Sequence, residues 1–232
     1  MANKYVDFVS DEEFLECVQH VCNAYPEDVE EINLEQLKRN VIDPVKQSFD
    51  IFAGKINYQD WLQNENLRQN DKTLNNAIGE FHQKLLGKVN GWIDLGVGDD
   101  TKLDLRKDDN TIFIELKNKY NTMNSDATDK CRDKLEKAIK EHPNAVAYWG
   151  FIISNNGSSG EVVWIKKGRT ENPKIKKIWG KRIYSLVTGK ENALEQVWKA
   201  LPLAIKDLLQ HSIDLSDEDE KNLKMFFDSA FH

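Results

Sequence analysis

Polar and apolar residues alternate along two neighbouring stretches in the middle of the chain, residues 102–106 and 111–117. Side chains of a strand point alternately to opposite faces, so each stretch is predicted to be a strand. The turn-forming residues Asp109 and Asn110 between them predict a hairpin with a two-residue loop. In the second strand, one face carries Ile112, Ile114 and Leu116, and the other carries Phe113, Glu115 and Lys117.

The same hairpin is predicted to bring two acidic residues together. A two-residue loop places Asp104 directly opposite Glu115, with Lys117 two residues further along the same face. Cross-strand partners have Cβ atoms about 4.5–5.5 Å apart, which allows two carboxylates to share one divalent cation. Two acids and a lysine on one face therefore indicate a metal-dependent phosphodiesterase centre. The alternative is that Glu115 and Lys117 belong to the solvated face of a half-buried sheet.

Apolar residues recur at helical spacing before the hairpin. Ser10 to Glu13 form a capping box that opens a first helix, and a second helix begins near Asn33, where Pro44 is expected to kink or split it. A third helix is predicted over roughly residues 73–89. Its apolar stripe consists of Leu74, Ile78, Phe81, Leu85 and Val89, and its opposite face of Asn76, Glu80 and Gln83.

After the hairpin, the pattern predicts a helix and then a buried strand. Asn124 or Ser125 caps the helix, and the continuous apolar run 145–153 suits a strand that is buried on both faces. Strand, helix and strand in this order imply a right-handed parallel crossover, so the sheet is mixed. The inward side of the helix carries Ala127, Cys131, Leu135 and Ala138 or Ile139, and its outside is expected to carry Lys130, Arg132, Lys134, Lys137 and Lys140.

The rest of the chain completes an α/β pattern. Strands are predicted at 161–165 and 182–187, and a capping box at 188–191 opens a helix that Pro202 interrupts, before a short helix at 223–231. We predict one domain over residues 1–232, with a central mixed β-sheet flanked by helices. Its mainly helical N-terminal part covers 1–72, and its catalytic core with DNA-recognition loops covers 73–211.

Composition narrows the class of protein. With 232 residues, 40% hydrophobic and 31% charged, the chain suits a soluble protein with one sizeable core. No signal peptide is visible, and the longest apolar run is too short to span a bilayer, so we expect a cytoplasmic protein without a membrane partner. Cys17, Cys22 and Cys131 lack paired spacing and are expected to be reduced.

Charge is distributed unevenly along the chain. The net charge of −7 argues against a general nucleic-acid coat, yet residues 166–190 contain nine basic residues and one acidic residue, Glu171. A basic run is usually a solvated surface. Here it follows a candidate phosphodiesterase centre in the sequence, so we interpret it as a candidate DNA-binding segment.

The order helix, hairpin, helix and buried strand, with Asp104, Glu115 and Lys117 in the hairpin, resembles the PD-(D/E)XK nuclease core. Leu103 stands where the motif often has proline. Three further segments, 75–83, 114–125 and 187–194, resemble those of type II restriction endonucleases that cut GGNCC. The resemblance implies a restriction-endonuclease-like fold and Mg²⁺-dependent hydrolysis of double-stranded DNA at a short palindromic G/C-rich site, leaving 5′-phosphate ends.

The resemblance also implies roles for individual residues. Asp104, Glu115 and the backbone carbonyl of Leu116 would hold Mg²⁺. Lys117 would orient or help deprotonate the attacking water and stabilise charge on the phosphate. Glu80 is a candidate for a second metal position, while Gln83 is a candidate either for DNA contact or for holding the site. A palindromic target implies a homodimer, and a restriction enzyme implies a cognate DNA methyltransferase in the host.

Contacts to DNA are expected from the loop after the hairpin and from the basic segment, because lysine and arginine bind phosphates and guanine edges. The candidates are Gln83, Lys119, Asn121, Asn124, Ser125, Lys166, Lys167, Arg169, Lys174, Lys176, Lys177, Lys181 and Arg182. Two alternatives remain from the sequence: a repair or recombination nuclease with the same core, and a noncatalytic DNA-binding protein.

Overall fold

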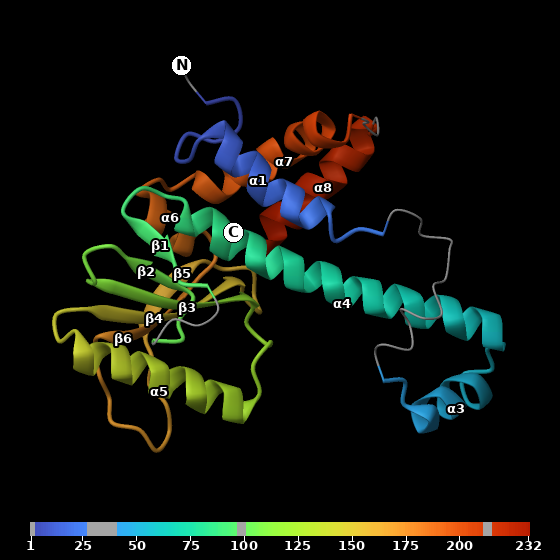
Figure 1. Cartoon of the computed structure of the whole chain (residues 1–232), viewed down its shortest axis with the longest axis horizontal. Helices are drawn as coiled ribbons and strands as arrows, with labels where there is room; N and C mark the ends of the chain where they lie inside the picture. Colours follow the sequence, from blue (N-terminus) through green and yellow to red (C-terminus); the bar gives the residue numbers. More distant parts are fainter. Residues whose placement is uncertain (1–2, 27–40, 97–100, 211–214) are drawn as a thin grey trace. The chain divides into compact units, whose positions relative to one another are not determined.

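The computed structural model describes residues 3–26, 41–96, 101–210 and 215–232 (Figure 1). The chain divides into two compact units, one of residues Met1–Gln19 and Gly79–His232, and the other of residues His20–Ile78. The predicted start of a helix near Asn33 lies outside the described residues. Among the helices that are described, none combines the length and the hydrophobicity that a membrane span requires.

The first unit is built on a mixed six-stranded sheet with the order β1-β2-β3-β4-β6-β5. Strands β1 to β3 are antiparallel, β3, β4 and β6 are parallel, and β5 is antiparallel to β6. This confirms the predicted mixed sheet and the parallel crossover. The strands are β1 (Trp92–Asp94), β2 (Leu105–Lys107), β3 (Ile112–Lys119), β4 (Val146–Ile153), β5 (Gly160–Val163) and β6 (Ile175–Trp179).

The central hairpin has the predicted register, although its loop is longer. Leu105 pairs with Ile114 and Arg106 with Phe113, which is the alignment that a loop at Asp109 and Asn110 requires. The strand β2 is shorter than predicted, because the backbone of Lys102 has a φ of 54° and leaves the extended region. The chain segment before Asp104 is therefore not part of the ladder.

One face of the sheet is covered by the crossover helix α5 (Ser125–Glu141), which Figure 1 shows lying along the sheet. Asn124 is its N-cap, since its side chain accepts a hydrogen bond from the backbone of Ala127 at 2.9 Å. The core on this face is apolar and aromatic, and includes Phe113, Cys131, Leu135, Ala138, Ala147, Trp149, Phe151, Trp164 and Ile175.

The opposite face packs on α6 (Lys181–Thr188), where the sequence predicted a strand at 182–187. That prediction is wrong, because Ile183, Tyr184 and Val187 are all buried, at a spacing that only a helix places on one side. Gly189, in the left-handed conformation, ends α6, so the predicted capping box at 188–191 is wrong as well. The strand β6 inside the basic segment was not predicted.

Further helices of the described residues lie wholly or mainly in the first unit. Ser10 and Glu13 form the predicted capping box at the start of α1 (Asp11–Cys22). Helix α7 (Ala193–Leu209) continues through Pro202, so the predicted interruption is wrong. Helix α8 (Asp217–Ala230) begins before the predicted tail helix, with a capping box at Ser216.

The second unit is helical within its described residues. Helix α3 (Pro44–Phe52) begins at Pro44, which occupies its first turn. The predicted kink is therefore wrong, and the helix that would precede a split lies outside the described residues. Helix α4 (Tyr58–Gly87) contributes its residues up to Ile78 to this unit, and its N-terminal half includes a polar stretch that was not predicted to be helical. Trp61 and Leu62 form its small core with Ile42, Ile51 and Ile56.

Candidate active site

The backbone of Asp104, the residue just before β2, is held by two hydrogen bonds. The Asp104 N–H donates to the carbonyl of Ile114 at 3.1 Å, and the Asp104 carbonyl accepts from the Leu95 N–H at 3.0 Å. The carboxylate of Asp104 then accepts a hydrogen bond from the Leu116 N–H at 2.6 Å. Both the backbone and the side chain of Asp104 are therefore fixed beside β3.

Lys117 lies between the two predicted acidic residues. Its Nζ is 2.9 Å from Oε1 of Glu115 and 3.4 Å from Oδ2 of Asp104. Glu115 is only 4% exposed, so the alternative interpretation of Glu115 and Lys117 as a solvated ion pair is wrong. The structure thus brings together the three residues that the sequence predicted to be catalytic.

The three residues are electrostatically unbalanced. Burial raises the pKa of Asp104, and the negative charge of Glu115 raises it further. Burial alone would lower the pKa of Lys117, but the charges of Asp104 and Glu115 outweigh that effect and the pKa is raised. Lys117 is therefore charged at neutral pH, while Asp104 is held in a place where additional positive charge would favour its ionised form.

The arrangement fits a hard divalent cation. Mg²⁺ is typically bound through one or two carboxylates and keeps oxygen ligands from water and phosphate. The N–H and C=O of one strand residue point to the same side, so the Leu116 carbonyl is expected on the side where its N–H meets Asp104. Within the described ranges, no group of three or more His, Cys, Asp and Glu side chains is arranged to hold a metal ion.

A second lysine, which the sequence predicted on the outside of its helix, contacts Glu115. Nζ of Lys134 in α5 is 2.9 Å from Oε2 of Glu115. Position 134 lies three residues after the buried Cys131 and four before the buried Ala138, so helical spacing was the signal that could have identified it. Burial and the charge of Glu115 raise the pKa of the Cys131 thiol to about 12, so this cysteine is not a nucleophile at neutral pH.

Arg132 was also expected on the outside of α5, and this is wrong because its side chain is fully buried. The guanidinium donates to the carbonyls of Trp164 and Thr170 at 2.7 and 3.1 Å, and to Glu136 at 2.8 Å. Arginine offers five donors in a planar fork, which suits the capture of several backbone carbonyls. Arg132 therefore attaches the start of the basic segment to α5.

Of the two α4 candidates, Gln83 has a clear structural role. Its side-chain amide donates to Oδ1 of Asp94 at 2.6 Å. Asp94 is the last residue of β1 and pairs with Leu105, the residue after Asp104, so Gln83 holds the strand that lies beside Asp104. The carboxylate of Glu80 is half exposed and lies 3.7 Å from Lys84.

The candidate DNA-binding residues do not share one face of the sheet. Lys166 and Arg169 form ion pairs with α5, at 3.2 Å to Asp129 and 2.7 Å to Asp133. Lys177 lies over the ring of Trp149 at 4.8 Å, on the same face as Glu115. Its pKa is lowered by burial and by Lys166.

Other candidates lie on the opposite face or at the surface. Lys176 and Arg182 both pair with Glu161, at 2.6 and 3.5 Å, on the face that packs on α6. The remaining candidates vary in exposure: Lys119, Asn121, Asn124, Ser125, Lys167 and Lys174 are exposed, and Lys181 is half-buried with its Nζ 6.0 Å from the centre of the Phe227 ring. Lys174 also donates to the carbonyl of Pro143.

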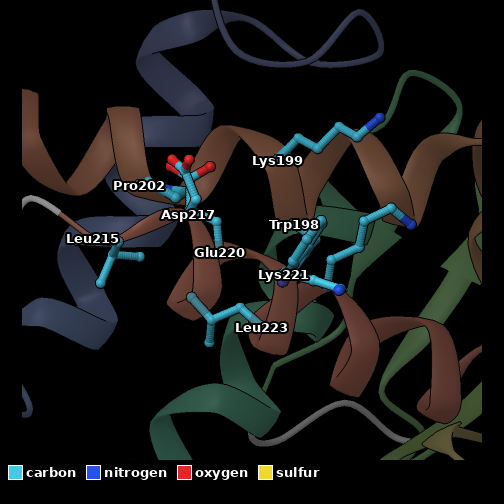
Figure 2. Close-up of a pocket in the computed structure, with 9 residues that line it drawn as sticks. Trp198, Lys199, Pro202, Leu215, Asp217, Glu220, Lys221 and Leu223 are labelled. Atoms are coloured by element: carbon cyan, nitrogen blue, oxygen red, sulfur yellow. The ribbon is translucent and has the colours of Figure 1, made fainter.

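A surface pocket of about 740 Å³ lies elsewhere in the same unit, between α7 and α8 (Figure 2). Its walls combine apolar and charged side chains, and they include none of Asp104, Glu115 and Lys117. Figure 2 shows Trp198, Lys199 and Pro202 from α7 and Asp217, Glu220, Lys221 and Leu223 from α8. This pocket is therefore separate from the candidate active site.

Most of the chain is similar to known restriction enzymes. The family model described as Eco47II restriction endonuclease matches residues 6–210, which include the hairpin and α5. The type II restriction enzyme Sau96I of Staphylococcus aureus is 34% identical over 221 residues, covering 90% of this chain and 83% of that protein. The type II restriction enzyme Eco47II of Escherichia coli is 33% identical over 201 residues, covering 78% of this chain and 80% of that protein.

Proposed function

The chain belongs to the Eco47II restriction endonuclease family, and from this premise we propose that it uses Mg²⁺ to hydrolyse double-stranded DNA at a short palindromic G/C-rich site similar to GGNCC. The family assignment makes it a site-specific deoxyribonuclease. The single observation that carries the proposed site is the position of Lys117 between the carboxylates of Asp104 and Glu115.

In this proposal, Asp104, Glu115 and the carbonyl of Leu116 hold the metal. The bound ion would lower the pKa of a water molecule and neutralise charge that develops on the phosphate. The Leu116 N–H fixes the Asp104 carboxylate, and the sheet pairing between β2 and β3 fixes the separation of the two acids. The chain thus supplies a preorganised set of oxygen ligands on rigid strands.

Lys117 performs the remaining chemistry of the site. Its ammonium group orients the attacking water beside the phosphate and stabilises the charge of the transition state. The water oxygen bonds to phosphorus and releases a proton to solvent. The bond from phosphorus to the 3′ oxygen breaks, and that oxygen takes up a proton from solvent. The products are a 5′-phosphate end and a 3′-hydroxyl end.

A palindromic site presents the same sequence on both DNA strands, and the described residues of one chain contain one candidate catalytic centre. We therefore propose that two copies act as a homodimer related by the two-fold axis of the DNA. We also propose a cognate methyltransferase that protects host DNA in the cytoplasm. Sedimentation of the protein with a duplex that contains its site, in Ca²⁺ to prevent cutting, is expected to show two chains per duplex.

Digestion of unmethylated plasmid DNA in Mg²⁺ tests the proposed function. The wild type is expected to give discrete fragments whose sequenced ends share one short palindrome, and Asp104→Asn is expected to give none. Fragments with unrelated ends would contradict the site-specific reaction. Equal cutting by Asp104→Asn would contradict the proposed catalytic residues.

A further inference from the structure

The carboxylate of Glu115 is held by two lysines from different elements. Lys117, on the same strand, is 2.9 Å from Oε1, and Lys134, on α5, is 2.9 Å from Oε2. Lys117 also contacts Asp104, whereas Lys134 approaches Glu115 from the helix that covers the sheet. The two oxygens of Glu115 are therefore directed to different sides, and Oε1 is the one on the side of Asp104.

The fold places Lys134 differently from the other lysines of α5. Cys131, Leu135 and Ala138 form the buried side of the helix, and position 134 lies at the margin of that side. The side chain of Lys134 is 30% exposed, while Lys130, Lys137 and Lys140 are exposed on the same helix. A long lysine stem packs along the core and delivers its charged end to Glu115.

We propose that Lys134 is a positioning residue of the active site, which acts through Glu115 and not on DNA. By holding Oε2, it fixes the side-chain orientation that leaves Oε1 for the metal shared with Asp104. It also balances the charge of Glu115 when Lys117 turns towards water and phosphate. This inference rests on the proposed function, because it takes Glu115 as a metal ligand.

A positioning role and a purely structural ion pair predict different results. Removing the positive charge of Lys134 leaves the two carboxylates more negative, so they attract a divalent cation more strongly. The same change releases Glu115 from its fixed orientation. Of its two lysine partners, Lys117 alone then contacts Glu115, and cleavage becomes slower. A structural pair has no such effect: losing it lowers stability without strengthening metal binding.

The test compares Lys134→Met with Lys137→Met, which removes an exposed lysine from the same helix. Mn²⁺ binding to the DNA-free full chain is measured by electron paramagnetic resonance, and single-turnover cleavage of plasmid is measured in saturating Mg²⁺. For Lys134→Met we expect cleavage to fall about 10–100-fold, and the dissociation constant for Mn²⁺ to fall at least about threefold. Lys134→Arg keeps a charged donor and is expected to restore both values, and Lys137→Met to leave both unchanged.

Unchanged cleavage in Lys134→Met would overturn the proposal, and so would slower cleavage with weaker Mn²⁺ binding. Where methionine lowers the midpoint of urea unfolding, Lys134→Gln provides a polar, uncharged replacement. It is likewise expected to slow cleavage and to strengthen Mn²⁺ binding. A further variant separates failure of this inference from failure of the proposed function on which it rests. If Asp104→Asn binds Mn²⁺ as well as the wild type does, the proposed metal site fails whatever Lys134 does.

Discussion

The two faces of the sheet each carry a glutamate that is paired with two cations. On the α5 face, Glu115 contacts Lys117 and Lys134, and on the α6 face, Glu161 contacts Lys176 and Arg182. The difference between them is a second acid. Asp104 shares Lys117 with Glu115, whereas the further polar contact of Glu161 is the hydroxyl of Tyr148, at 3.3 Å.

The electrostatics of the two clusters differ in direction. Burial and the charge of Glu115 raise the pKa of Asp104, so the lysines of that cluster do not fully stabilise the ionised form of Asp104. Burial would raise the pKa of Glu161, but the hydrogen bond and charge of Lys176 outweigh it and the pKa is lowered. The Glu161 cluster is therefore a satisfied ion network, whereas the Glu115 cluster fits the metal site that we propose.

The largest expected effect is on catalysis at the α5 face. Lys117→Met removes the group that we propose to orient water, so cleavage at saturating Mg²⁺ is expected to fall about 10²–10⁴-fold. Single-turnover digestion of plasmid measures this change. Lys176→Met, its counterpart in the Glu161 cluster, serves as the control and is expected to leave the cleavage rate of bound DNA within about twofold of the wild type, because Lys176 lies on the other face. Similar losses in both variants would remove the distinction between the clusters.

A large effect on stability is expected at Arg132, which attaches the basic segment to α5. Arg132→Met leaves the carbonyls of Trp164 and Thr170 without this donor. The free energy of unfolding is expected to fall by about 2–4 kcal/mol, because two carbonyls lose a charged hydrogen-bond donor inside the fold. Urea unfolding measures this change, with the exposed Lys130→Met on the same helix as control. A loss of less than about 1 kcal/mol would show that the segment is held by other contacts.

An intermediate effect is expected at Asn124, which is both the N-cap of α5 and a candidate DNA contact. Asn124→Ala is expected to cost about 1 kcal/mol of unfolding free energy, and Asn124→Asp to preserve the cap. Binding to duplex DNA in Ca²⁺ separates the two roles. If Asn124→Asp keeps stability and weakens binding, the residue also contacts DNA; if it keeps both, the cap is its role and the predicted contact is wrong.

The smallest effect is expected at Glu161. Because its pKa is lowered in the folded chain, its contribution to stability is present above its ordinary pKa and is lost as pH falls through the folded value. Glu161→Gln is expected to change the unfolding free energy at pH 7 by less than about 1 kcal/mol. It is also expected to make stability fall less steeply in acid than in the wild type. If the unfolding free energies of Glu161→Gln and the wild type fall in parallel below about pH 4.5, the stabilising role of ionised Glu161 is contradicted.

The hairpin was predictable because residues close together in the sequence determine it. Alternation determines the faces of β3, and the register follows from the turn residues, so the sequence alone places Asp104, Glu115 and Lys117 together. The longer loop at residues 108–111 leaves this register unchanged. The mixed sheet and crossover follow from the order of elements and the buried run of β4.

Other features depend on tertiary contacts that a local pattern does not contain. Residues 182–187 are rich in residues that favour strands, yet they form α6 because packing on the sheet buries one helical side. Helical spacing places Lys134 and Arg132 near the buried side of α5, but the groups that their long side chains contact depend on tertiary packing. The lysines of the basic segment share a sequence region and still lie on two faces, because β6 alternates through it.

The central claim is that Asp104 and Glu115 form the metal-dependent cutting centre, while Glu161 forms an ion network with no catalytic role. Mn²⁺ binding to the DNA-free full chain, measured by electron paramagnetic resonance in the wild type, Asp104→Asn and Glu161→Gln, tests this claim most directly. We predict that binding is lost in Asp104→Asn and retained in Glu161→Gln. Retention in Asp104→Asn, or equal loss in both variants, would contradict the account.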